Sequence, residues 1–328
     1  MIPYAMLLQA ADEHVTAGRI IREYAGFLSF FAVYGAIGFH FQVLKDLRRE
    51  PAIDVGGSPV DRADRRAAAI GFVGSVLMVV LMLRSLLERA AAKNITLMGA
   101  VQAGGGRQIF QIACVSLFFI CFALAVQRMR TGWVVAGLVA IAYALRNITT
   151  GRWFSNVNPL HEISASLWLG TLLVLAIAGL TTVFRSDVTS DERGRLVATM
   201  VSRFSPLALS AAALLGITGV TTAWRHLKHL NALWTTPYGF ALDAKLCVVA
   251  LVVVMGAWNW RRMAPKLGNE EGAAAITRSA TTELGFAAIV LAITALLVSL
   301  PSPGPSGPPG SGAPVPKAAA PMSPATSR

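Results

Sequence analysis

Three histidines and one glutamate are the residues of this chain whose types and spacing could bind a metal at a membrane surface. His226 and His229 lie three residues apart in "TTAWRHLKHLNALWTTPYG", which begins at Thr221. Residues three apart share one face of a helix, so both imidazoles could face a single ion. His161 and Glu162 lie in "NPLHEISASLWLG", at the start of another apolar segment. Two or three imidazoles with a carboxylate or a water suit copper(II) or zinc.

Each of these histidines can also be explained without metal binding. His226 and His229 can be solvated loop side chains, and His161 can be a capping or packed residue at the membrane interface. A shared metal site is favoured because all three are predicted at the same membrane face. His40 lies at the far end of the first apolar segment, where an interfacial side chain is the simpler expectation.

Composition places these residues in a membrane protein. The chain has 328 residues, of which 55% are hydrophobic and 14% charged, with a mean hydropathy of +0.58. Soluble domains carry about 25% charged residues. Helices satisfy every backbone polar group inside lipid, so the sequence predicts an all-α polytopic bundle.

Eight apolar segments have about the 20 residues that a helix needs to cross the hydrocarbon core. The segments are 24–44, 67–87, 108–127, 132–149, 160–183, 203–223, 238–260 and 281–300. They predict eight transmembrane helices. We expect a four-span half over 1–150, a second four-span half over 151–300, and a Pro/Gly/Ala-rich disordered tail over 301–328.

The distribution of Lys and Arg predicts the orientation. Basic residues are in excess in the odd-numbered connections, most clearly in the first, which holds Lys45, Arg48, Arg49, Arg62, Arg65 and Arg66. The positive-inside rule then places these connections in the cytoplasm and both termini outside. The net charge of +12 reflects this topology. The partner that it indicates is the lipid bilayer, and no basic domain suggests nucleic acid.

Small residues suggest which helices approach each other. They lie in the fifth segment at Ser164, Ala165 and Gly170, and in the sixth at Ser210, Ala211–Ala213, Gly216 and Gly219. Such surfaces let membrane helices pack closely. We therefore expect the fifth and sixth helices to be neighbours, which would bring His161 towards His226. The stretch "REPAIDVGGSPVDRAD", which ends at Asp64, reads as a loop.

Several motifs resemble the copper resistance protein D (CopD) family. They are "LHEISASLWLG", "GITGVTTAWRHLKHLNALWTTPYGFALDAKL", "GAWNWRRMAPKL" and "ITRSATTELGFAAIVLAITALLVSLPSPGP", and the similarity spans 160–303. The resemblance implies an eight-span protein of the bacterial inner membrane with periplasmic termini. It also implies copper movement across that membrane, with a small periplasmic copper carrier of the CopC type as a partner.

The resemblance bears on the histidines unequally. His161 carries over from the "LH" opening, whereas His226 and His229 occupy a loop in which the family varies. Many relatives have a Gly-His-Ala-like element after the fourth span, but this chain reads "ALRNITTGRWFSNVNP" there and has no histidine between His40 and His161. We expect a site rebuilt with His226 and His229, or a weakened or lost one.

The leading hypothesis is a non-enzymatic copper permease that takes up Cu(I) or Cu(II) at His161, His226, His229 and Glu162. No GxxxxGK[ST] loop is present, so transport would be facilitated or ion-coupled. Two alternatives stay open: a b-type haem protein that passes electrons, and a non-transporting membrane scaffold for a periplasmic copper carrier.

Overall fold

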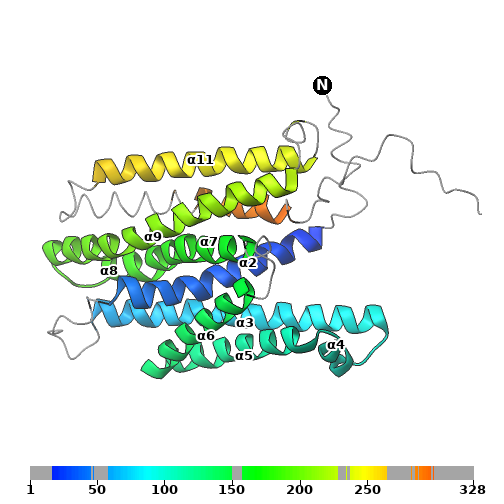
Figure 1. Ribbon diagram of the computed structural model, residues 1–328. Coiled ribbons are helices and arrows are strands. Elements are labelled where there is room, and N and C mark those ends of the chain that lie inside the picture. The colour runs from blue at the N-terminus through cyan, green and yellow to red at the C-terminus, as the bar shows by residue number, and fades with distance from the viewer. Residues whose placement is uncertain are drawn as a thin grey trace, which may run out of the picture.

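A computed structural model describes most of the chain. The described residues are 17–45, 47, 58–149, 157–227, 234, 237–263 and a discontinuous set between 282 and 298. Every regular element within these ranges is a helix. The long helices run side by side, and successive helices alternate in direction (Figure 1). This confirms the helical bundle that the composition predicts.

Between residues 17 and 149, the described part of the first half contains four long helices and one short one. They are α2 (Ala17–Gly38), which continues as the π-helix η1 (Phe39–Val43), then α3 (Pro59–Lys93), α4 (Leu97–Ala103), α5 (Gly105–Val126) and α6 (Arg130–Thr149). Sequential neighbours pack in pairs, α2 on α3, α3 on α5, and α5 on α6.

The start of α3 differs from the expected loop, because residues 59–64 already belong to the helix. Ser58 is its N-cap and accepts a hydrogen bond from the Asp61 backbone amide at 3.1 Å. Pro59 follows in the first turn, where its missing N–H costs nothing. The helix ends at Lys93, and its C-cap Asn94 adopts a left-handed conformation (φ 50°). Between these caps, α3 extends beyond its apolar segment by about two turns at each end.

The second half begins with a helix that changes its winding. This helix consists of α7 (Val157–Val174), the π-helix η3 (Leu175–Leu180) and α8 (Thr181–Phe184). The helices α9 (Ser190–Leu227) and α11 (Pro237–Met263) follow it. Figure 1 shows α11 alongside α9 at the edge of the bundle.

Helix α7 lies at the centre, because it packs against both α2 and α9. The α2–α7 contact is a close main-chain approach at two glycines. A Cβ on Gly35 would lie 2.2 Å from the Gly170 carbonyl oxygen, and a Cβ on Gly170 would lie 2.4 Å from the Phe31 carbonyl oxygen. Only glycine allows the two backbones to come this close.

The predicted neighbourhood of the fifth and sixth helices is confirmed by the α7–α9 packing. The small residues that form the contact differ from the expected set. Gly219 faces the His161 ring, but Gly170 faces α2, and a Cβ on Gly216 would have no neighbouring atom within 4 Å. The reason is angular, because Gly216 is three residues from Gly219 and lies on the more exposed side.

Six of the described helices are long and apolar enough to cross a membrane. They correspond to the first six predicted spans and make the chain a multi-pass membrane protein. Helix α11 coincides with the seventh predicted span, 238–260, and the eighth, 281–300, is described in part, as a discontinuous set of helical residues between 282 and 298. The count of eight and the orientation stay predictions, and the tail over 301–328 also lies outside the described residues.

Candidate functional site

His161 lies near the start of α7 and turns its ring towards α9. The Nδ1 atom is 3.1 Å from the Thr218 hydroxyl oxygen. A Cβ on Gly219 would lie 3.2 Å from His161 Cε1 and 3.7 Å from Nδ1, so this edge of the ring faces α9. The absence of a side chain at Gly219 leaves room for the imidazole.

The hydroxyl of Thr218 and the main chain of Leu215, both on α9, are hydrogen-bond partners of the His161 ring, and Thr218 favours one tautomer. Its hydroxyl donates to the Leu214 carbonyl oxygen at 2.7 Å and is buried. A hydroxyl has a single hydrogen, so its oxygen accepts from the His161 Nδ1–H. In the neutral ring, Nε2 then holds the unprotonated lone pair. Metal-binding histidines have this arrangement, with one nitrogen fixed by a hydrogen bond and the other free for the ion.

A third helix also approaches His161. Lys245 of α11 lies within electrostatic range of the His161 ring. Residues of α7, α9 and α11 therefore come near one another at this end of the bundle. The positive charge of the Lys245 ammonium group disfavours the binding of a metal cation at the His161 ring.

Glu162 lies near α2 and α6, whereas the neighbouring His161 contacts α9. Its carboxyl lies within electrostatic range of Glu23 in α2 and of Tyr143 in α6. It also lies within range of Tyr34, whose hydroxyl donates to the Ala140 carbonyl oxygen at 3.2 Å. Successive residues point about 100° apart on a helix, which explains the separation. The carboxyl of Glu162 is thus directed towards the first half of the bundle.

The remaining predicted ligands are only partly described. Because α9 continues through Leu227, His226 lies in its last turn, about 10 Å along the helix beyond Gly219. It is therefore helical, at the same end of the bundle as His161, and His229 lies outside the described residues. Within the described part of the chain, no three His, Cys, Asp or Glu side chains form a metal-binding group. The four-residue site stays a prediction.

His40 is more deeply built into the structure than the sequence indicates. It lies in η1, is 8% exposed, and its Nδ1 is 2.8 Å from Asp64 Oδ1 of α3. Its ring stacks on Trp133 of α6 at 4.0 Å with an interplanar angle of 21°. The expectation of a plain interfacial side chain is therefore wrong. The sequence pattern predicts a loop at Asp64, so it does not pair this residue with His40. The Ser58–Pro59 pair, which is typical of a helix start, is the signal that places Asp64 in a helix.

Comparison with known proteins links the chain to copper. Residues 198–297 match the family model "Copper resistance protein D". This range includes His226 and His229 and begins after His161 and Glu162. No solved structure matches the chain at a significant level.

A curated relative extends the same link. The "Copper transport protein CutJ" of Bacillus subtilis (strain 168) is 29% identical over 144 residues, which are 44% of this chain and 25% of the relative. The matched part thus spans about a quarter of the relative's length. Over 198–297 the chain is therefore similar to the CopD family, and the distant relative carries the same link to copper.

Proposed function

We propose that the protein carries copper ions across the bacterial inner membrane through eight helices, with both termini in the periplasm. The family match and the printed name of the relative support copper as the cargo. The apolar helices support a path through a bilayer. The role is transport and not an enzymatic reaction.

The observation that carries this proposal is the orientation of His161. The hydrogen bond to Thr218 leaves Nε2 as the unprotonated nitrogen, which is the form that binds a metal. Under the proposal, copper binds at Nε2, and His226, His229 and Glu162 supply further ligands as the ion enters or leaves. Lys245 weakens binding of the cation, which suits a site that must release its ion.

A small periplasmic copper carrier of the CopC type is the proposed partner. Its support is the similarity to the CopD family, together with the position of His161 and His226 at one end of the bundle. This end would deliver copper to the carrier or receive copper from it.

Copper flux into proteoliposomes tests the proposal. We expect His161→Ala to abolish flux of the purified protein, and the His226→Ala/His229→Ala double variant to reduce it. His14→Ala is the control, because His14 belongs to the N-terminal segment outside the described residues and is not among the predicted ligands. Unchanged flux in His161→Ala would remove this residue from the mechanism. A Soret band in the purified wild type would instead favour the haem alternative.

A further inference from the structure

A cleft of about 510 Å³ opens between the first turns of α2 and the last turns of α3. It lies at the end of the bundle where α7 begins (Figure 1). The lining residues are Arg22, Glu23 and Gly26 of α2 and Leu81, Ser85, Glu88, Arg89 and Ala92 of α3. This volume is within the range of small-ligand sites, about 300–1,000 Å³. The cleft belongs to the first half of the chain, which the family model does not cover.

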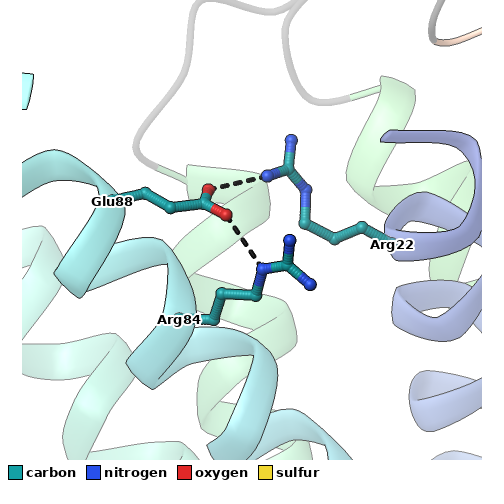
Figure 2. A network of polar contacts seen from close by, with 3 residues as sticks. All are labelled: Arg22, Arg84 and Glu88. Carbon is teal, nitrogen blue, oxygen red and sulfur yellow. Dashed lines mark hydrogen bonds and ion pairs between the residues drawn. The ribbon is translucent and has the colours of Figure 1, made fainter. Parts of the chain in front are cut away.

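Arginines dominate the charge of the cleft and its rim. Figure 2 shows the Glu88 carboxylate between Arg22 and Arg84, which donate to it from Nη1 at 2.8 Å and from Nε at 2.9 Å. Arg89 donates to the Gln108 side chain at 2.8 Å. These three guanidiniums exceed the two carboxylates, Glu23 and Glu88, by one charge.

The guanidiniums retain capacity for another anion. Each has five N–H donors, and these hydrogen bonds use one donor apiece. The side chains of Arg22 and Arg84 are 33% and 62% exposed, so their free donors are accessible. Guanidinium forks match the oxygen geometry of phosphate.

An exposed apolar stripe lies beside the cleft on α3. It consists of Val76 (37% exposed), Val80 (53%), Leu83 (47%) and Leu87 (49%). A rotation of 100° per residue places Arg84 between this stripe and the cleft-lining stripe of Leu81, Ser85 and Glu88. From Arg84 the apolar stripe extends towards the middle of the helix. A headgroup at Arg84 would therefore have its hydrocarbon chain on this stripe.

We propose that this cleft binds an anionic phospholipid, with the headgroup phosphate on Arg22, Arg84 and Arg89 and an acyl chain along the α3 stripe. The 35 residues of α3 span about 52 Å, which exceeds the hydrocarbon thickness of about 30 Å. Its last turns therefore reach the level of the headgroups. The excess of cationic groups selects an anionic lipid over a zwitterionic one.

The test measures lipid retention by the purified full-length chain in native mass spectrometry, with phosphatidylglycerol and phosphatidylcholine of equal chain length. We expect the wild type to retain phosphatidylglycerol preferentially. Arg22→Gln and Arg84→Gln should each lower that retention about fivefold, the effect of one cation near an anionic headgroup. Arg130→Gln, at the opposite end of the bundle, is the control and should change nothing.

Glu88→Gln separates lipid binding from a purely structural ion pair. It removes the carboxylate that competes with phosphate for the two guanidiniums, so phosphatidylglycerol retention should rise. Arg84→Lys keeps the charge but loses the fork, so it should give an intermediate value if Arg84→Gln does not fold.

Three results would overturn the proposal. The first is equal retention of the two lipids by the wild type. The second is a fall in retention in Glu88→Gln, and the third is displacement of phosphatidylglycerol by an equal concentration of inorganic phosphate. No copper is needed in the assay, so the result does not depend on the transport proposal.

Discussion

At the scale of single residues, the hydrogen bond between His161 and Thr218 is the contact with the clearest functional consequence. Thr218→Val preserves the side-chain volume but removes the hydroxyl acceptor at Nδ1, and leaves only the Leu215 main chain hydrogen-bonded to the ring. Loss of such an orienting partner lowers metal affinity about 10–100-fold. We expect a decrease of this size in copper affinity, measured by competition with a chromophoric chelator.

Thr221→Val is the matched control for this substitution. The Thr221 hydroxyl makes the same kind of intrahelical bond, to the Ile217 carbonyl oxygen at 2.9 Å, but it is exposed. Equal copper affinities in the two variants would show that Thr218 does not orient a ligand.

The His40–Asp64 pair gives a second prediction at this scale. We expect a double-mutant cycle with His40→Phe and Asp64→Asn to show a coupling free energy of unfolding of about 1.5–3 kcal/mol, as for hydrogen bonds to charged groups. Thermal unfolding in a fixed detergent measures it. The exposed Arg84–Glu88 pair is the comparison and should show a smaller coupling. No difference between the two cycles would contradict a specific His40–Asp64 interaction.

At the scale of elements, the glycine contact between α2 and α7 predicts a strong asymmetry between two similar substitutions. Gly170→Ala places a methyl group against the Phe31 main chain and should lower the free energy of unfolding by about 1–3 kcal/mol. Gly216→Ala meets no atom within 4 Å and should raise it by about 0.5–1 kcal/mol through helix propensity. Calorimetry on both variants checks the signs, and a neutral Gly170→Ala would contradict the close contact.

Hydropathy identified the helices much better than their ends. The second and sixth segments were expected from 67 and 203, whereas α3 begins at Pro59 and α9 at Ser190. Helical turns outside the hydrocarbon are polar and add no hydropathy signal, so only the capping residues reveal them. The small residues around Gly219 did predict which helix approaches His161. The direction of the Glu162 carboxyl could not be predicted, because it depends on the packing of α2 and α6.

At the scale of the whole molecule, the orientation can be tested on a single helix. Asp61 and Lys93 are exposed at opposite ends of α3. If the odd connections are cytoplasmic, an impermeant thiol reagent should label Lys93→Cys but not Asp61→Cys in intact cells. The background needs Cys247→Ser only, since Cys114 and Cys121 are buried. Labelling of Asp61→Cys alone would reverse the proposed topology.

The backbone contact at Gly35 and Gly170 also limits how this bundle can move. Two helices whose main chains touch cannot slide past each other without a clash, so we expect α2 and α7 to keep their relative position. If the proposed transport exposes His161 alternately to the two sides, we expect the movement at the α7–α9 contact, where the His161 side chain lies between the two helices. Movement of α9 relative to α2 and α7 is what we expect from this difference between the two contacts.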